Sequence, residues 1–307
     1  MIILAAFAEV LLPVLVVVLA GYALRRAFAL DLASLNRVSL YALSPALIFT
    51  TLVRTKVDGD EALRLVLMAV LFCLAIGLLT LVGATPFRLD RAGTAALLLC
   101  TMFMNTGNFG LPISHFAFGE AGLQRALLFF IPQAIMAQVL AVLIAQMAGG
   151  DDQPAWRRVL RMPQIYAVLG GLLLRASGLD LAARTDALGS LFRGIALLSD
   201  AALPFLLMLL GMQLAQGVAI EDRRLTALAV GLRLLAAPLL AYALGLALGL
   251  DGLSLRVGVL QASMPTAVNM VLYSLEFGAR PRFVAGVVVA STIASLVTLT
   301  LLVGLMR

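Results

Sequence analysis

The sequence predicts an all-α membrane protein of ten transmembrane helices, built as two inverted repeats of five, with interruptions in the fourth and ninth helices. The first reason is composition, because 63% of the 307 residues are hydrophobic and only 12% are charged, against roughly 45–50% and 25% in soluble domains. Ten apolar stretches long enough to cross a bilayer are the second reason. The third is that two of these stretches carry Gly, Pro and amide side chains near their middle.

The ten apolar stretches define the expected helices in order. The first is too long for the hydrophobic region of a signal peptide and is followed by Arg25 and Arg26, so we interpret it as a retained transmembrane helix. The expected spans are residues 2–24, 34–53, 62–85, 93–118, 123–147, 164–179, 187–216, 225–249, 254–277 and 282–305.

One connection is long and polar enough to divide the chain. Residues 149–163 predict a cytoplasmic linker between a first repeat, residues 1–148, and a second repeat, residues 164–307. Because each repeat has five helices, the second enters the membrane from the opposite side, which makes the repeats inverted. Weak internal echoes support this prediction, since Pro45 is expected to break the second helix and Pro204 the seventh.

The distribution of Lys and Arg predicts the orientation in the membrane. Twelve of them lie on the side of the connections 1–2, 3–4, 5–6, 7–8 and 9–10, and nine lie on the other side. Cytoplasmic loops carry the excess of positive charge. Both termini are therefore expected in the periplasm.

Several function classes are disfavoured by what the chain contains. The net charge of +6 comes from basic residues scattered over short loops, which does not indicate a nucleic-acid partner. Cys73 and Cys100 lie in apolar runs, as packing residues do. With one histidine and no pair of aspartates in the spans, an intramembrane enzyme is disfavoured. No phosphate-binding Gly-rich loop is present, so we expect no cofactor or metal, and energy from ion or substrate gradients.

The interruption at residues 105–112 is the first candidate site. Asn105, Thr106, Gly107 and Asn108 combine a flexible backbone with amides and a hydroxyl, and Pro112 suits the first turn of a new half-helix. Unpaired backbone groups in hydrocarbon cost several kcal/mol, so spans are interrupted only where protein or a watery cavity satisfies those groups. Half-helix N-termini carry about +0.5 charge, which favours an anionic substrate.

The ninth stretch has a second interruption at a similar depth, over residues 261–269. Pro265, Thr266 and Asn269 are its candidate substrate-binding residues. Two broken helices in matching positions of two halves indicate a transporter binding site. The alternative is a pair of kinked packing helices, because Gly and Pro are common in membrane helices.

Five further polar residues within the spans are candidates. Gln133 and Gln138 are about 140° apart on a regular helix and share a face only loosely. His115, Asp200 and Arg233 are candidate coupling residues, because ionisable groups in a span are costly and often functional. Each has a structural alternative: a hydrogen-bonded histidine, a carboxylate that caps a half-helix, and an arginine in an ion pair.

Three features of the chain carry a family resemblance: the run Asn105-Thr-Gly-Asn-Phe-Gly-Leu-Pro112, the ten helices split five and five, and the run Pro204-Phe-Leu-Leu-Met-Leu-Leu-Gly211. With these features the chain resembles the auxin efflux carrier family over essentially its whole length. Pro265 stands where that family has its second crossover proline. The resemblance implies a fold related to bile-acid sodium symporters, in which helices 4 and 9 cross beside the substrate. It also implies that Asn105 and Asn108 are crossover residues and that Gln133 and Gln138 face the substrate.

The same resemblance implies how the helices are used. Helices 1, 2, 6 and 7 would form a scaffold and a homodimer interface, and helices 3–5 and 8–10 a transport domain that moves in an elevator-like alternation. Plant PIN proteins have a proline where this chain has Met104, and a long loop where its linker has about 15 residues. The chain therefore resembles the bacterial relatives of the PIN and PIN-LIKES proteins, in the inner membrane.

We therefore expect a secondary active transporter of small organic anions, such as auxin-like monocarboxylates or dicarboxylates, coupled to a proton or sodium gradient. A sodium-coupled symporter of the bile-acid type is the nearer alternative, which an effect of sodium on binding would distinguish. An intramembrane enzyme is the distant one.

Overall fold

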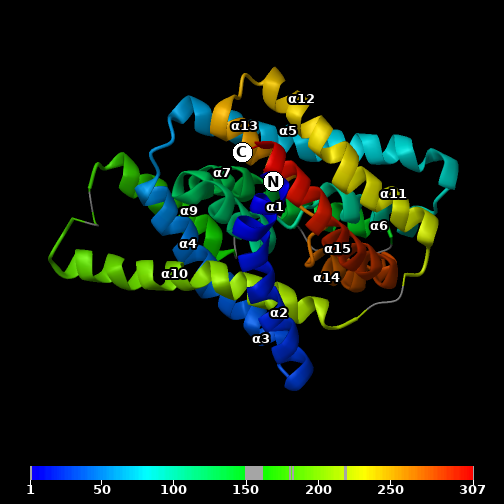
Figure 1. The fold of residues 1–307 in the computed structure, drawn as a ribbon, viewed down its shortest axis with the longest axis horizontal. Coiled ribbons are helices and arrows are strands. Elements are labelled where there is room, and N and C mark those ends of the chain that lie inside the picture. The colour runs from blue at the N-terminus through cyan, green and yellow to red at the C-terminus, as the bar shows by residue number, and fades with distance from the viewer. Residues whose placement is uncertain (1, 149–161, 180, 182, 218–219, 307) are drawn as a thin grey trace.

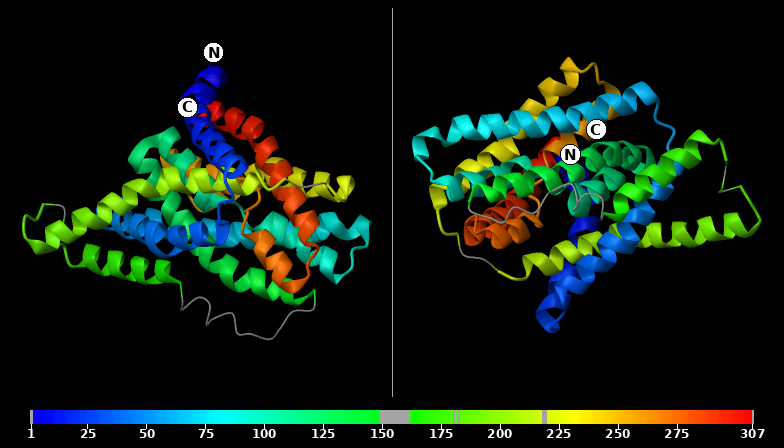
Figure 2. Two further views of the ribbon diagram at one scale, coloured as in Figure 1. Left: turned by 90° about the horizontal axis from the view of Figure 1, so that it is seen from below. Right: turned by 180° about the vertical axis from the view of Figure 1, so that it is seen from behind.

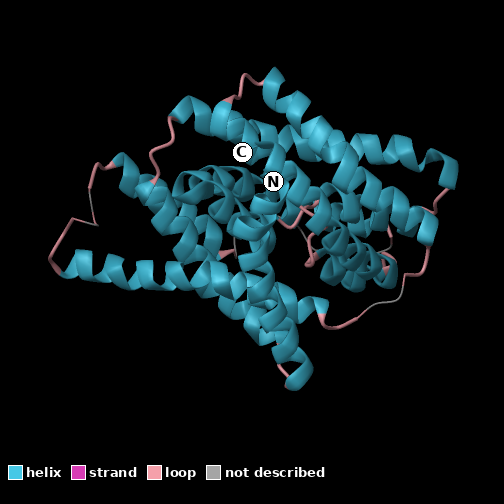
Figure 3. Cartoon of the chain, viewed as in Figure 1, coloured by secondary structure: helices cyan, strands magenta, loops and turns pink. Residues whose placement is uncertain are grey.

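The computed structural model describes residues 2–148, 162–179, 181, 183–217 and 220–306 (Figure 1). The elements of these residues are helices joined by short connections, apart from one isolated bridge (Figure 3). The prediction of an all-α membrane protein is confirmed. Most of the predicted linker, residues 149–161, lies outside the described residues.

The first half of the chain begins with three long helices, each made of consecutive helical elements. The first consists of α1 (Ile2–Ala6), η1 (Phe7–Leu11) and α2 (Leu12–Ala27), and the second of α3 (Leu32–Val38), η2 (Ser39–Leu43) and α4 (Ser44–Arg54). The third consists of α5 (Gly59–Ala84) and η3 (Thr85–Phe87). The predicted fourth and fifth stretches follow as α6 (Arg91–Met102), η4 (Thr106–Gly110) and α7 (Leu111–Gln146). Gly119 divides α7, because its φ of +64° and ψ of −158° are not helical and suit only glycine.

The second half of the chain also contains both long and interrupted helices. It comprises α9 (Pro163–Ala176), α10 (Ala187–Leu214), α11 (Arg223–Gly231), η5 (Leu232–Ala236), α12 (Ala237–Ala247), α13 (Gly252–Ala262), α14 (Met270–Phe277) and α15 (Pro281–Met306). Seven segments of the described chain are long and apolar enough to cross a membrane, namely Ile3–Ala27, Leu32–Arg54, Gly59–Phe87, Thr106–Ala141, Ala187–Leu214, Arg223–Ala247 and Pro281–Met306.

Four π-turns share one cause that the sequence shows. Each of η1, η2, η4 and η5 ends two residues before a proline, at Pro13, Pro45, Pro112 and Pro238. Proline has no N–H and its ring clashes with the carbonyl four residues earlier, so a wider turn just before it relieves the clash. The helix therefore continues through Pro45, and α10 runs unbroken through Pro204. The expected breaks at these two prolines were wrong.

Aspartates mark where several helices begin. Asp31, Asp58, Asp90, Asp186 and Asp222 each accept a backbone N–H from the first turn of the helix that follows. Such caps satisfy donors that have no partner within the helix. Hydrogen bonds from Arg184 and from the backbone of the first turn lower the pKa of Asp186 to about 2.

The helices pack as two groups. We call α1–α4, α9 and α10, with η1 and η2, helix group A, and α5–α7 and α11–α15, with η3, η4 and η5, helix group B; α1 is placed in group A because η1 joins it to α2, although it packs on α15 of group B. In group A, α10 packs on α2 and α4, and α4 on α9; in group B, α5 packs on α6, α7 and α12, and α13 on α7. The two ends of the chain lie side by side, where α1 packs on α15 (Figure 2).

Two glycines set the closest approach in group A. A Cβ on Gly211 would lie 1.8 Å from the Val18 carbonyl oxygen, and one on Gly21 would lie 2.0 Å from that of Met208. Small residues let membrane helices approach with their backbones in contact. Packing of α2 against α10 therefore depends on glycine at both positions.

We expect Gly211→Ala to lower the stability of the protein by about 1–3 kcal/mol, because the added methyl forces the backbones of α2 and α10 apart. The measurement is thermal unfolding of the purified protein in detergent. The control is Gly194→Ala on the same helix, where a Cβ meets nothing within 4 Å, so stability is unchanged or rises by up to about 1 kcal/mol. Equal melting temperatures for the two variants would contradict the expected contact.

Candidate functional site

The structure brings the two interrupted segments together. The backbone N–H of Asn105 donates to the Pro265 carbonyl at 2.7 Å, and that of Ala267 donates to the Phe103 carbonyl at 2.9 Å. These bonds flank an antiparallel bridge between Met104 and Thr266. Chain segments more than 150 residues apart thus satisfy each other's backbone groups, and we call this pairing of residues 103–105 with 265–267 the crossing.

The carbonyls that the break leaves at the end of α6 are satisfied by side chains and backbone from several helices. The donors come from α5, η5, the ninth-helix break and α7. The bonds are Thr266 Oγ1 to Cys100 O at 2.7 Å, Arg233 Nη1 to Thr101 O, Cys73 Sγ to Met102 O at 3.7 Å, Ala267 N to Phe103 O at 2.9 Å, and Gln133 Nε2 to Met104 O at 3.4 Å. Five consecutive carbonyls are satisfied in this way, as a break inside hydrocarbon requires.

Gln133 and Gln138 both lie on one cavity, although they are loosely related on a regular helix. Gln133 is 3% exposed and uses both ends of its amide, because Thr106 Oγ1 donates to its Oε1 at 2.8 Å and its Nε2 donates to Met104. Gln138 accepts from the Tyr273 hydroxyl at 2.6 Å. Gln133 therefore fastens α7 to the break, and Gln138 joins α7 to α14.

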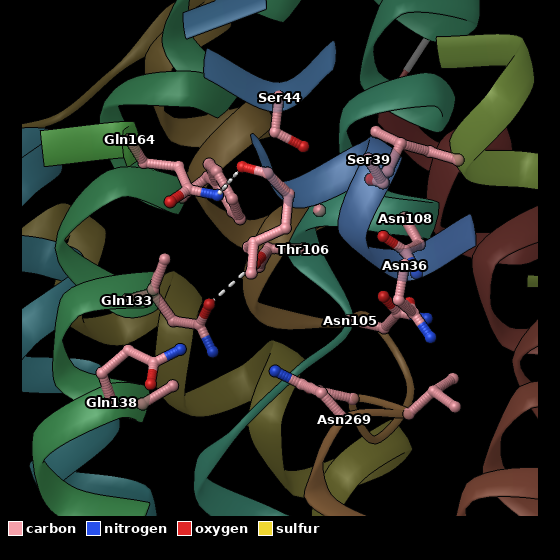
Figure 4. A pocket seen from close by; sticks show the side chains of 18 of the residues that line it. Asn36, Ser39, Ser44, Asn105, Thr106, Asn108, Gln133, Gln138, Gln164 and Asn269 are labelled. Atoms are coloured by element: carbon pink, nitrogen blue, oxygen red, sulfur yellow. Dashed lines mark hydrogen bonds between the residues drawn. The ribbon is translucent and has the colours of Figure 1, made fainter. Parts of the chain in front are cut away.

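A cavity of about 400 Å³ lies between the two helix groups beside the crossing (Figure 4). Group A lines it from α3, η2, α4, α9 and α10, and group B from the α6–η4 segment, α7 and α14. The polar lining residues are Asn36, Ser39, Ser44, Asn105, Thr106, Asn108, Gln133, Gln138, Gln164, Gln213, Asn269, Tyr273 and Glu276. Gly107 also lines the cavity. Seven of the predicted site residues therefore line the same cavity.

Asn105 carries an unused donor on the cavity wall. Its side chain is 5% exposed, and its Nδ2 has no hydrogen-bond partner within the described structure. An unsatisfied buried polar group costs about 1–3 kcal/mol. A ligand atom that accepts a hydrogen bond would remove this cost.

Two residues that line the cavity from group A each carry a buried acceptor. Gln164 donates to the Leu40 carbonyl at 3.0 Å and Gln213 donates to Asn36 at 3.3 Å. The Oε1 atoms of both glutamines have no partner among the described residues. The residues that line the cavity thus carry an unpaired donor in group B and unpaired acceptors in group A.

The electrostatics of the cavity come from backbone as well as side chains. No Lys, Arg or His is among its described lining residues, and Glu276 is a carboxylate near the end of α14. The N-terminal ends of the η4–α7 segment and of α14 lie at the cavity, through Thr106, Gly107 and Asn269. Helix N-termini provide unpaired N–H groups and partial positive charge, which suit an anion.

Five predicted residues lie outside the cavity lining, namely Pro265, Thr266, His115, Asp200 and Arg233. Pro265 and Thr266 are buried in the crossing itself, and the Thr266 N–H donates to Ser291 Oγ at 3.2 Å. His115 is half-buried in α7, with its Nδ1 unpaired within the described structure. Asp200 is on the exposed face of α10. Structural roles fit Pro265 and Thr266, and the geometry gives His115 and Asp200 no contact with a ligand in this cavity.

Arg233 differs from its expected structural role. The ion pairs found among the described residues do not include it; its guanidinium instead donates to three backbone carbonyls at the crossing. Like Pro265 and Thr266, it is not on the cavity lining. Pro238 was the sequence signal that could have indicated an irregular helix at Arg233, because the π-turn before this proline contains Arg233.

Sequence reasoning missed the polar residues that group A contributes. Asn36, Ser39, Ser44, Gln164 and Gln213 line the cavity from α3, η2, α4, α9 and α10. Each lies near the end of an apolar stretch or next to a proline, where a polar residue is equally typical of the membrane interface. The recurrence of polar residues at such positions in several spans was the sequence signal that could have identified them.

Comparison with known proteins gives a consistent result. A family model described as "Membrane transport protein" matches residues 6–303. An "Uncharacterized transporter" of Methanothermobacter thermautotrophicus is 33% identical over 302 residues, which are 95% of this chain and 96% of the relative. A "Probable auxin efflux carrier component 1c" of Oryza sativa is 25% identical over 180 residues, which are 58% of this chain and 28% of the relative.

We expect Gln133→Met to lower the stability by about 1–3 kcal/mol, because the buried Thr106 hydroxyl and Met104 carbonyl each lose a partner. Gln138→Met is the matched control. It removes one bond from a half-buried position, where water can replace the amide, so the loss is below about 1 kcal/mol. Thermal unfolding of both variants provides the comparison, and an equal loss in both would refute the fastening role of Gln133.

Proposed function

The chain belongs to the auxin efflux carrier family of membrane transport proteins, and on that premise we propose that it is a secondary active transporter of small organic anions. The substrate binds in the cavity beside the crossing, in contact with Asn105 and Asn108. The observation that carries this proposal is the buried, unpaired Asn105 amide on a cavity wall formed by two broken helices.

The proposed architecture has ten membrane-crossing helices in two inverted repeats. The counterpart of α6, its break and the η4–α7 segment is α13, its break and α14. Support comes from the pairing of the two breaks, in which the 103–105 and 265–267 segments exchange hydrogen bonds in both directions. The repeats are residues 1–148 and 164–307, as proposed from the sequence.

The proposed mechanism is an elevator in which group B moves against group A. Side-chain hydrogen bonds within each group support it, because Thr50 donates to Ser199 within group A and Thr80 donates to Thr101 within group B. Gln124 of α7 reaches Lys56, in the connection between α4 and α5. A substrate held between the groups would be carried by the moving one.

The proposed orientation places the cavity toward the cytoplasm. Asn36, Met162, Gln213 and Glu276 line it and lie at helix ends that lead to the connections 1–2, 5–6, 7–8 and 9–10. The excess of Lys and Arg is on that side. We propose a bacterial cytoplasmic membrane, both termini in the periplasm, and a homodimer formed through group A.

The free groups of the cavity define the proposed substrate more closely. A carboxylate suits the Asn105 amide and the helix N-termini. The unpaired Gln164 and Gln213 oxygens suit an N–H or O–H donor elsewhere on the same molecule. Indole-3-acetate and malate have both features, whereas succinate has carboxylates and lacks the donor.

A thermal-shift screen of the purified protein tests the proposed function. Indole-3-acetate, malate and succinate are compared with and without sodium and at two pH values. Stabilisation by an acid is expected, with malate more effective than succinate, and its dependence on sodium or pH identifies the coupling ion. A dependence on sodium favours the bile-acid type of symport. Absence of stabilisation by all three acids would overturn the anion proposal.

Asn105→Ala and Asn108→Ala are each expected to abolish substrate-dependent uptake into proteoliposomes and leave folding and dimerisation intact. The reason is that both side chains lie on the cavity and Asn105 is not otherwise bonded through its Nδ2. Gln216→Ala, an exposed amide at the end of α10, is the control with normal uptake. Uptake at the wild-type rate by either asparagine variant would remove that residue from the site.

A further inference from the structure

Arg233 is a fully buried cation whose partners are helix ends. Its side chain is 0% exposed and it lies in the π-turn η5. Its Nε donates to the Met264 carbonyl at 3.1 Å, its Nη1 to that of Thr101 and its Nη2 to that of Ala262. A buried charge is tolerated only when it is well compensated, so these three carbonyls hold the guanidinium in place.

The three carbonyls belong to the ends of two half-helices. Thr101 is in the last turn of α6, Ala262 is the last residue of α13, and Met264 lies two residues beyond it. Each helix C-terminus carries roughly −0.5 charge from its unpaired carbonyls. One guanidinium therefore carries about the charge that balances both C-terminal ends at the crossing.

The other two half-helix ends have the opposite sign. The η4–α7 segment and α14 begin at the cavity, and each N-terminus carries roughly +0.5 charge. Without a cation at the C-terminal ends of α6 and α13, their negative charge would largely cancel the positive electrostatic potential of the two nearby N-terminal ends. With the negative ends balanced, the two helix N-termini together present about one unit of positive charge to the cavity, where Glu276 is the acidic side chain and no basic side chain is among the described lining residues.

We propose that Arg233 is the positioning residue that gives the cavity its preference for anions, by neutralising the C-terminal ends of α6 and α13 from outside the cavity. It acts on the substrate through the field of the helix ends and touches no ligand. The inference rests on the proposed function, because it concerns selectivity at the same site. It also assigns the intramembrane arginine a role other than ion coupling.

The shape of arginine suits this role. Its planar fork presents several N–H donors at fixed angles, and here Nε, Nη1 and Nη2 reach three different carbonyls. The guanidinium carbon also lies 5.5 Å from the centre of the Phe72 ring, which is within range of a cation–π contact. Lysine would keep the charge and lose most of this geometry.

The test compares a charged ligand with its uncharged counterpart. Affinities for indole-3-acetate and indole-3-acetamide, and for malate and its diamide, are measured by thermal-shift titration. In Arg233→Gln the affinity for the acid is expected to fall about tenfold or more, because the uncompensated C-terminal ends then oppose the attraction of the N-terminal ends for the carboxylate. The affinity for the amide stays within about threefold, because an uncharged group senses the field weakly.

Two variants separate charge from packing. Arg233→Lys keeps the preference for acid over amide even where its melting temperature falls. Arg256→Gln removes the same charge from an exposed position on α13 and changes neither affinity. A parallel loss of acid and amide binding in Arg233→Gln would assign Arg233 a purely structural role and overturn the inference.

The outcomes also distinguish this inference from the proposed function. If the wild type binds neither acid, the proposed function fails and the inference falls with it. If the wild type binds an acid and Arg233→Gln keeps its acid-to-amide ratio, only the inference fails. Where Arg233→Gln gives no monodisperse protein, Arg233→Lys decides, because loss of the preference with the charge retained would refute the electrostatic role.

Discussion

The structure depends on satisfying the backbone groups that two broken helices expose inside an apolar protein. A regular helix pairs these groups internally, whereas a break leaves N–H and C=O groups that lipid cannot serve. Here the donors come from different helices: Cys73 from α5, Gln133 from α7 and Arg233 from η5. Because one break recruits partners from so many elements, it also holds those elements together as helix group B.

The same bonds explain why the cavity forms beside the crossing. The carbonyl ends of α6 and α13 are occupied by Arg233, Thr266 and each other's backbone. The N-terminal ends of the η4–α7 segment and α14 keep N–H groups that no helix can pair. Polar groups that remain available are therefore concentrated on the N-terminal side, where Asn105, Asn108 and Asn269 lie.

Much of this arrangement could be predicted from the sequence, because its causes are local. Asn, Gly and Pro at residues 105–112, and Pro265 in the second interruption, disfavour a regular helix whatever surrounds them. Apolar length likewise defined most helix ends to within a few residues. Pro204 shows where local reasoning fails, because packing of α10 against α2 and α4 keeps the helix intact.

The long-range contacts could not be predicted for a physical reason. Arg233 is bonded to residues 29 to 132 positions away, and nothing near it in the sequence identifies carbonyls as its partners. The five polar residues of group A were equally hidden, since an amide near a helix end has the same local signature at an interface and at a cavity. Only the fold decides between these roles, by bringing α3, η2, α4, α9 and α10 to the crossing.

The amides around the cavity divide into structural and available ones, and this division limits what can bind. Gln133 uses both of its polar atoms within the protein, whereas Asn105 keeps a donor and Gln164 keeps an acceptor. The donor belongs to group B and the acceptor to group A, so one ligand that satisfies both bridges the two groups. A ligand that pairs the donor and the acceptor favours closure of helix groups A and B around it, because each polar atom costs about 1–3 kcal/mol while it stays unpaired. A ligand that pairs only one of them leaves the other cost in place and favours closure less.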